Sequence, residues 1–401
     1  MVIEEKRLRK HYSIMRKICF ITGTRAEYGL LSRLMKMVQD DTDTQLQIIA
    51  TNMHLSPKFG NTYQEIEKDG FTIDKKIPIL EDGKDDANAT VKSMSKALAG
   101  YADAYDELKP DIVVVLGDRY EILAATTAAL IERIPIAHLY GGDITEGAYD
   151  DSIRHSVTKM SHLHFTSCEE YRHRVIQLGE QPDHVFNVGS IGVENIKLLP
   201  LMSKAEIEKE IDFAIDDHTI LATYHPVTLG NRTAKEDIDD FIAALDEMKD
   251  LRIIFTMPNS DNGSQAIVDA ITTFVTQNPL RAKAFKSLGV LRYLSVMQQV
   301  VAVVGNSSSG LVEVPSFGIP TLNIGDRQKG RMSADSVFNC ETDKQSVLKG
   351  LEVVLSDEFK EKAAATHNPY DKEGTAQAIF DVISTYPLDG LNQKHFYDIQ
   401  L

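Results

Sequence analysis

Short aliphatic runs alternate with longer segments of helical periodicity along the whole chain. In the first half these runs are KICFITG, LQIIAT, DIVVVLGD, PIAHLYGG, LHFTS and HVFNVGS, beginning at residues 17, 46, 111, 135, 163 and 184. The second half repeats the pattern with TILATYH, LRIIFTMP, VVAVVGNSSSG and PTLNIGD, beginning at residues 219, 251, 300 and 320. Apolar strands that alternate with helices are typical of parallel sheets with crossover helices. The pattern therefore predicts an α/β fold.

Two successive series predict two Rossmann-like, doubly wound domains. The strands restart after NVGSIGVENIKLLP (187–200), where Gly and Pro interrupt the pattern. We predict an N-terminal domain over 1–190, in which 1–14 is a flexible extension or an upstream start. A second domain is predicted over 191–375. The last helical pattern and tail, 376–401, are expected to pack back toward the first domain.

Polar residues follow many of the predicted strands. Ligands of open parallel sheets bind beyond the carboxyl ends of the strands. The first half supplies mainly acids, arginines and glycines there: Thr24, Arg25, Glu27, Asp118, Arg119, Gly141, Gly142 and Asp143. The second half supplies mainly imidazole, amide and hydroxyl groups: His225, Asn259, Asp261, Asn306, Ser307, Ser308, Ser309, Gly310, Glu313 and Arg327. We expect a site between the domains that a nucleotide diphosphate with an attached sugar would fill.

Composition narrows the class of partner. The formal charge of -16, from 43 Lys and Arg against 59 Asp and Glu, repels polyanions. Nucleic acid and anionic membrane are therefore not expected partners. The charged N-terminus has no apolar signal region and no run of 18 apolar residues occurs, so we expect a cytoplasmic protein. Three widely spaced cysteines form no disulfide or zinc framework, and we interpret them as packing residues.

Two glycine-containing turns are candidates for anion binding. TGTRAEYG (22–29) leads from a strand into a helix, whose free N–H groups can receive an anion, although an ordinary tight turn would look the same. It lacks the G-x-G-x-x-G spacing of NAD sites and the Lys of a P-loop. GNSSSGLVEV (305–314) exposes more donors than one helix cap needs, and Glu313 could accept hydrogen bonds from a ribose.

A third motif gathers charge on one predicted helix. In YDDSIRHSVTKMSH (149–162), Asp151 lies three and four residues before Arg154 and His155, which places them on one face. A solvated surface helix would show the same pattern. His225 precedes Pro226 at a strand end, where a structural histidine is the alternative to a functional one. The arginines beside these acids disfavour a divalent ion, so neither a metal nor another cofactor is expected.

Several of these motifs together resemble the hydrolysing UDP-N-acetylglucosamine 2-epimerases of bacterial sialic-acid synthesis. The matching segments, in order, are TGTRAEYG, VLGDRYE, YDDSIRHSVTKMSHLHFTS, YHPVT, GNSSSGLVEVPSFGIP and NIGDRQKGR. The resemblance implies the glycosyltransferase-B architecture with a UDP-binding second domain, and a homodimer or homotetramer. It also implies conversion of UDP-N-acetylglucosamine and water to N-acetylmannosamine and UDP. The implied route is anti elimination of UDP to a 2-acetamidoglucal, followed by hydration.

The resemblance also implies roles for single residues. Asp118 and Asp150 correspond to catalytic carboxylates, with Arg154 and His225 near the reacting end. The UDP group is expected to be held by Arg25, Arg119, His225, Asn259, Ser307, Ser308, Glu313 and Arg327. Several relatives carry a catalytic Glu where this chain has Tyr140, and a phenol is a poor base at neutral pH. One hypothesis is that Asp143 supplies the missing carboxylate; another is that water does.

Three other functions are alternatives. The first is the same reaction on UDP-2,4-diacetamido-2,4,6-trideoxyglucose, which the motifs do not distinguish from UDP-N-acetylglucosamine. The second is the non-hydrolysing epimerase, which retains UDP. The third is a glycosyltransferase of the same architecture, or a silent nucleotide-sugar-binding protein.

Overall fold

The computed structural model describes residues 15–81, 86–227, 229, 232–259, 261 and 263–400. The expected extension over residues 1–14 lies outside the described residues. The first half contains a parallel sheet in the order β3-β2-β1-β4-β5-β6-β7. Its strands are β1 (Arg16–Thr22), β2 (Thr44–Thr51), β3 (Lys75–Ile77), β4 (Ile112–Leu116), β5 (Ile136–Leu139), β6 (Leu163–Thr166) and β7 (Val185–Asn187).

The second half contains another parallel sheet, in the order β10-β9-β8-β11-β12-β13. Its strands are β8 (Thr219–Thr223), β9 (Arg252–Thr256), β10 (Ala282–Phe285), β11 (Ala302–Gly305), β12 (Thr321–Ile324) and β13 (Val337–Cys340). In each sheet the chain winds outward from a central strand and then returns to its other side. The predicted α/β fold with two doubly wound sheets is confirmed.

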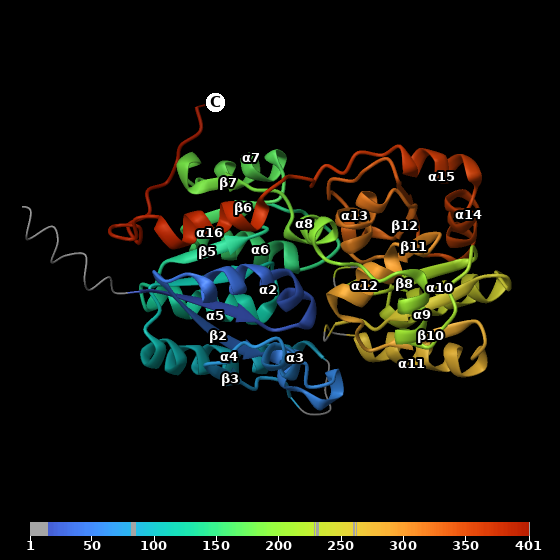
Figure 1. Ribbon diagram of the computed structural model, residues 1–401, viewed down its shortest axis with the longest axis horizontal. Helices are drawn as coiled ribbons and strands as arrows, with labels where there is room; N and C mark the ends of the chain where they lie inside the picture. Colours follow the sequence, from blue (N-terminus) through green and yellow to red (C-terminus); the bar gives the residue numbers. More distant parts are fainter. Residues whose placement is uncertain are drawn as a thin grey trace, which may run out of the picture.

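Helices cover the faces of both sheets (Figure 1). Those of the first half are α2 (Arg25–Asp40), α3 (Tyr63–Lys68), α4 (Ala87–Leu108), α5 (Tyr120–Ile131), α6 (Asp150–Met160), α7 (Glu169–Gln177) and α8 (Ile191–Leu198). Those that follow are α9 (Lys204–Ile211), α10 (Ala234–Glu247), α11 (Ser264–Gln277), α12 (Gly289–Met297), α13 (Ser309–Val312), α14 (Lys344–Val354), α15 (Asp357–Ala364) and α16 (Thr375–Thr385). None of the helices in the described ranges is long and apolar enough to cross a membrane.

The alternation of side chains along each central strand produces a separate apolar core on each face of the sheet. Along β1, Ile18 and Phe20 point into one core, whereas Cys19 and Ile21 point into the other. Strand β9 does the same in the second sheet, with Ile253 on one side and Ile254 on the other. Burial on both faces explains why these strands are continuously apolar in sequence.

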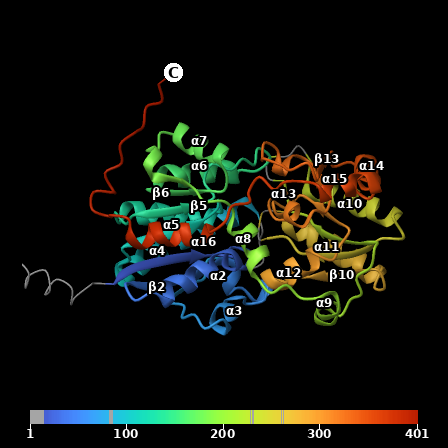
Figure 2. The same ribbon diagram turned by 45° about the horizontal axis from the view of Figure 1, so that its top comes forward.

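The last helix, α16, packs against α2 and β1 of the first sheet rather than against the second sheet that precedes it in sequence (Figures 1 and 2). Its Ile379 and Ile383 belong to the core around β1, and Arg16 Nη1 donates a hydrogen bond to the Ile383 carbonyl at 3.0 Å. Helix α8 also contacts α2 and α16. The domain boundaries at 190 and 375 stay predictions.

Candidate active site

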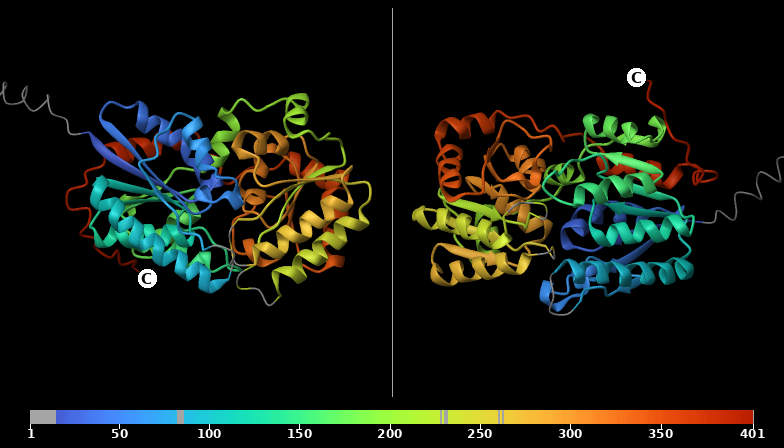
Figure 3. Two further views of the ribbon diagram at one scale, coloured as in Figure 1. Left: turned by 90° about the horizontal axis from the view of Figure 1, so that it is seen from below. Right: turned by 180° about the vertical axis from the view of Figure 1, so that it is seen from behind.

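The two sheets lie side by side (Figure 3), and many of the candidate site residues come from the loops at their switch points. In the first sheet, the chain turns to the other side of the sheet between β1 and β4, and in the second between β8 and β11. Residues after β1 and β4 include Arg25 and Asp118, and residues after β8 and β11 include His225 and Ser307. Switch points leave a crevice that no crossover helix covers, which is why ligands bind there.

Two adjoining cavities receive these side chains. The first, which we call the carboxylate cavity, has a volume of about 170 Å³ and is lined by residues that include Asp118, Tyr140, Asp143, Asp150, Arg154 and Arg331. The second, the serine cavity, has a volume of about 300 Å³ and is lined by residues that include Arg25, His225, Asn259, Ser307, Ser308 and Ser309. Four residues line both cavities: Leu30, Ser308, Glu313 and Arg327. A ligand with a polar head and an anionic tail could therefore occupy both.

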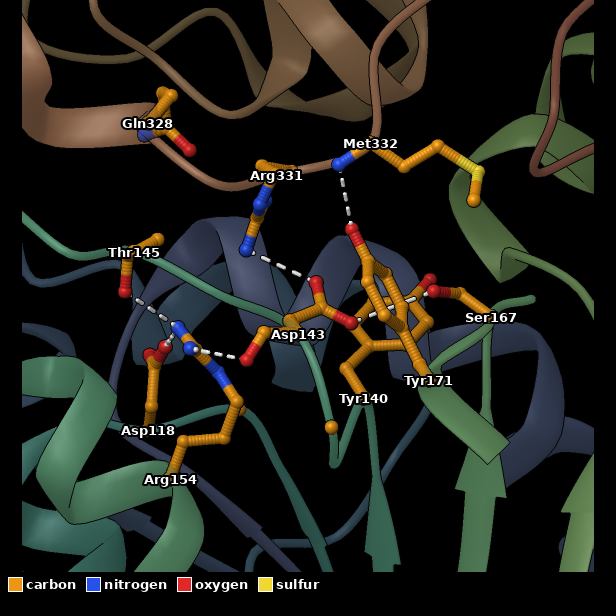
Figure 4. Close-up of polar contacts among 12 residues, drawn as sticks. Asp118, Tyr140, Asp143, Thr145, Arg154, Ser167, Tyr171, Gln328, Arg331 and Met332 are labelled. Atoms are coloured by element: carbon orange, nitrogen blue, oxygen red, sulfur yellow. Dashed lines mark hydrogen bonds and ion pairs between the residues drawn. The ribbon is translucent and has the colours of Figure 1, made fainter. Parts of the chain in front are cut away.

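Arg154 organises the carboxylate cavity. It lies in α6, its side chain is 1% exposed, and its Nη2 donates to Asp118 Oδ2 (Figure 4). The same guanidinium donates to the Asp143 carbonyl at 2.9 Å, to Asp151 Oδ1 at 3.1 Å and to Thr145 Oγ1 at 3.0 Å. A buried guanidinium needs this many acceptors to offset its desolvation. Arg154 thereby fixes Asp118 and the loop after β5 in one geometry.

Asp118 and Asp150 have opposite proton affinities in the same cavity. Burial raises the pKa of Asp118, but Arg154 and Arg331 outweigh it and leave the net pKa below the ordinary value. Burial and the negative charge of Asp118 raise the pKa of Asp150 to about 7. At neutral pH the first carboxylate is therefore ionised, whereas the second titrates.

Asp143 also lines the carboxylate cavity, paired with an arginine that the sequence analysis did not single out. Arg331 Nη2 lies 2.9 Å from Asp143 Oδ2, and both side chains are more than nine-tenths buried. Ser167 Oγ donates to Asp143 Oδ1 at 3.4 Å. Arg331 lies in the segment NIGDRQKGR, so its motif is recognisable in the sequence. Because Arg331 lies in a loop beyond β12, the sequence does not indicate which residue its side chain contacts.

Tyr140 occupies the wall of the same cavity with its backbone in the left-handed region, at φ 67°. Its hydroxyl lies 3.1 Å from Ser190 Oγ and accepts a hydrogen bond from the Gly192 N–H at 3.4 Å. Burial raises the pKa of this phenol well above its usual range. Tyr140 is thus neutral and can donate or accept hydrogen bonds, but it cannot act as a carboxylate would.

The serine cavity is shaped by a tight approach of β11 to β8. Gly305 has φ 134°, and a Cβ at this position would lie 1.9 Å from the Thr223 carbonyl oxygen. Directly after it, the Asn306 side chain accepts from the His225 N–H at 2.7 Å and donates to the His225 carbonyl at 2.8 Å. Asn306 therefore holds the loop after β11 against the loop after β8. The three serines that follow Asn306 line the cavity.

His225, Glu313 and Arg327 are three of the ionisable groups that line the serine cavity, together with Arg25 and Lys286. Burial, together with the charge of Arg327, lowers the pKa of His225 to about 3, so its imidazole is neutral. Burial raises the pKa of Glu313 to about 7. Arg327 Nη1 donates to the Asn306 carbonyl at 3.2 Å. The charge available for an anionic ligand at the junction of the cavities is that of Arg327.

The remaining predicted residues divide into two groups. Arg25 and Asn259 line the serine cavity, and Arg25 Nε also lies 2.5 Å from Glu65 Oε2. Arg119 does not line either cavity: it is buried between Glu121 at 2.8 Å and Asp261 at 3.0 Å, the latter from the second half. Gly310, like Asn306, supports the wall without lining it.

Among the described residues, no group of three or more His, Cys, Asp or Glu side chains could hold a metal ion.

Comparisons with known proteins agree with this architecture. The family model described as UDP-N-acetylglucosamine 2-epimerase matches residues 36–384. The solved structure of the UDP-N-acetylglucosamine 2-epimerase from Neisseria meningitidis bound to UDP-N-acetylglucosamine has the same fold. Its TM-score is 0.74 at 18% identity, with 92% of this chain and 99% of that chain covered.

Three curated relatives match almost the full length. The GDP/UDP-N,N'-diacetylbacillosamine 2-epimerase (hydrolyzing) of Campylobacter jejuni is 44% identical, covering 96% of this chain and 99% of that protein. The polysialic acid biosynthesis protein P7 of Escherichia coli is 38% identical, covering 96% and 98%. The UDP-N,N'-diacetylbacillosamine 2-epimerase (hydrolyzing) of Legionella pneumophila is 34% identical, covering 96% and 100%. The chain therefore belongs to the UDP-N-acetylglucosamine 2-epimerase family.

Proposed function

We propose that this protein is a hydrolysing UDP-sugar 2-epimerase whose substrate is UDP-N,N'-diacetylbacillosamine, a UDP-2,4-diacetamido-2,4,6-trideoxy sugar. Two of the relatives described above carry this activity in their names, at 44% and 34% identity. The sequence motifs by themselves imply UDP-N-acetylglucosamine as the substrate, with the trideoxy sugar as the alternative. The similarities favour the second, and UDP-N-acetylglucosamine is retained as the other candidate because the matching family model bears its name.

One observation carries the proposal: the carboxylate cavity and the serine cavity share a wall at Arg327, Ser308 and Glu313. A nucleoside diphosphate sugar spans such a pair of cavities with the sugar among carboxylates and the diphosphate beside a guanidinium and hydroxyls. The reaction breaks the bond between C1 and the diphosphate oxygen. That bond therefore has to lie near the shared wall.

In the proposed first step, a carboxylate removes the proton from C2 while the C1–oxygen bond breaks, which gives UDP and a 2-acetamidoglycal. Asp118 is assigned as the proton acceptor, since Arg154 and Arg331 keep it ionised. Charge that develops on the departing diphosphate would be stabilised by Arg327, together with the serine hydroxyls and the neutral imidazole of His225.

In the second step, water adds its oxygen to C1 and releases a proton to solvent, while C2 receives a proton on the opposite face. Exchange with solvent then returns Asp118 and Asp150 to their starting protonation states. Asp150 is assigned as the proton donor, since its pKa of about 7 leaves it partly protonated at neutral pH. Because the two carboxylates have different proton affinities, one is suited to act as the base and the other as the acid. Tyr140 is assigned to sugar binding through its neutral hydroxyl.

The test is proton NMR in D2O with three substrates offered separately and without acceptor: UDP-N,N'-diacetylbacillosamine, GDP-N,N'-diacetylbacillosamine and UDP-N-acetylglucosamine. We expect UDP release in step with a free 2-epimerised sugar deuterated at C2, and at least tenfold higher kcat/KM for the UDP trideoxy sugar. Preference for UDP-N-acetylglucosamine would select the other candidate. A nucleotide-bound epimer would indicate the non-hydrolysing reaction, and absence of turnover with all three would contradict the proposal.

A further inference from the structure

The segment 326–332, made up of η5 (Asp326–Gln328) and the loop that follows it, forms a continuous seam with the first half. The Glu146 N–H donates to the Lys329 carbonyl at 3.2 Å, and a Cβ on Gly147 would lie 2.5 Å from the Asp326 carbonyl oxygen. The Met332 N–H donates to Tyr171 Oη at 2.9 Å. These contacts join residues 326–332 to the loop after β5 and to α7, so one wall of the carboxylate cavity is present only while the halves meet.

Arg331 makes the charged contact of this seam. Figure 4 shows its side chain reaching from the second-half loop to Asp143, where Nη2 and Oδ2 are 2.9 Å apart. Its Nε is buried and has no hydrogen-bond partner among the described residues. Arg331 also lowers the pKa of Asp118. It therefore acts on two carboxylates of the first half from a loop of the second half.

Arg327 and Arg331 stand four residues apart on one loop, but only Arg327 lines both cavities. A ligand anion that binds Arg327 holds the loop, and the loop holds Arg331 over Asp143. We infer that Arg331 is a positioning residue: it couples nucleotide binding to assembly of the sugar site by holding Asp143 in place. The kinetic consequences of this inference rest on the proposed function. The closure of the two halves on UDP binding, which it also implies, can be measured without turnover.

The kinetic test compares Arg331→Met, Arg331→Lys, Asp143→Asn and the double variant Arg331→Met with Asp143→Asn. Lys197→Met is the control, because Lys197 forms a surface ion pair with Asp371 at 2.6 Å, away from both cavities. Misplaced catalytic geometry costs about 100-fold in rate. We expect that loss in kcat for Arg331→Met and a loss in UDP affinity of tenfold at most, because closure and UDP binding are linked. We expect a smaller loss in kcat for Arg331→Lys.

The single variants should not be additive. If Arg331 acts through Asp143, the double variant is no slower than the slower single variant by more than threefold. A shift of the acidic limb of the kcat/KM profile to higher pH in Arg331→Met would report the loss of its charge from Asp118. Two outcomes overturn the inference: kcat of Arg331→Met within twofold of wild type, or an equal loss in UDP affinity, which would make Arg331 a nucleotide ligand.

A second measurement needs no reaction. Small-angle scattering should show that UDP makes wild type and Lys197→Met more compact, and that it compacts Arg331→Met and a second variant, Arg331→Gln, less. If wild type turns over none of the three sugars, the proposed function fails while this difference still supports the coupling. Equal compaction of wild type and of either folded Arg331 variant would overturn the coupling.

Discussion

At the scale of single residues, the candidate site depends on two carboxylates whose pKa values differ because one guanidinium contacts only one of them directly. Arg154 contacts Asp118 directly, whereas Asp150 has burial and the charge of Asp118 as the leading influences on its pKa. The same side-chain type is thus ionised at one position and close to its titration point at the other. This separation gives both an acceptor and a donor of protons near neutral pH.

Asp150→Asn should lower kcat by about 100-fold or more, because the amide cannot donate the proton assigned to the carboxyl group. In wild type the donating form is present below the Asp150 pKa of about 7 and is lost as pH rises through it, so kcat/KM should fall on the alkaline side. Steady-state kinetics from pH 5 to 9 measures both. Asp150→Glu keeps a carboxyl group and should keep the alkaline limb at a lower rate. A rate for Asp150→Asn within tenfold of wild type would remove Asp150 from the proton transfers.

Arg327→Ala should weaken UDP binding by about 1–3 kcal/mol, the usual cost of losing a charge-assisted hydrogen bond. Isothermal titration calorimetry with UDP measures the change. Lys329→Ala is the matched control: it removes a cation from the same loop, but the Lys329 side chain is 60% exposed and its nearest acid is Asp326, 4.0 Å away. Equal UDP affinity of Arg327→Ala and wild type would exclude Arg327 from the site.

At the scale of elements, the sequence predicted the central strands and missed three edge strands. Strands β3, β10 and β13 have the sequences KKI, AKAF and VFNC, and most of their residues are only partly buried. Edge strands bury less surface and tolerate charge, so they lack the aliphatic run that identifies β4. The positions of cavity-lining residues directly after central strands, such as Asp118 and His225, were predictable for the same reason. Arg331 was missed because its partner is set by how the two halves meet, which no local pattern encodes.

Gly305→Ala should destabilise the junction of β11 and β8. The new methyl group would lie 1.9 Å from the Thr223 carbonyl oxygen, and the residue would keep a φ of 134°. Overpacking of this kind costs about 1–3 kcal/mol, and the backbone strain adds to it. Urea unfolding measures the loss. Gly374→Ala is the control, because that glycine also has positive φ, at 72°, but nothing lies within 4 Å of its Cβ position. A loss no larger than that of the control would show that the two strands can separate without cost.

At the scale of the whole molecule, the chain connects its halves more than once. It leaves the first sheet after β7, builds the second sheet, and returns through α16 to the core around β1. Arg119 and Asp261 add a buried ion pair between the halves. The loops that carry the two cavities are therefore held from both ends of the second half. Any closure of the halves over a ligand would have to take place within that restraint.

Because α16 belongs to the core of the first sheet, a destabilising substitution in α16 should affect elements that are far from it in sequence. Ile383 is fully buried against that core, and Ile383→Ala should cost about 2–5 kcal/mol. Hydrogen exchange followed by mass spectrometry should show that Ile383→Ala speeds exchange, relative to wild type, more in β1 and α2 than in β8 and β9. Gln377→Ala, on the exposed side of the same helix, should change neither region, since surface substitutions stay within about 0.5 kcal/mol. Faster exchange confined to the second sheet would mean that α16 stabilises the half that precedes it in sequence, contrary to its contacts.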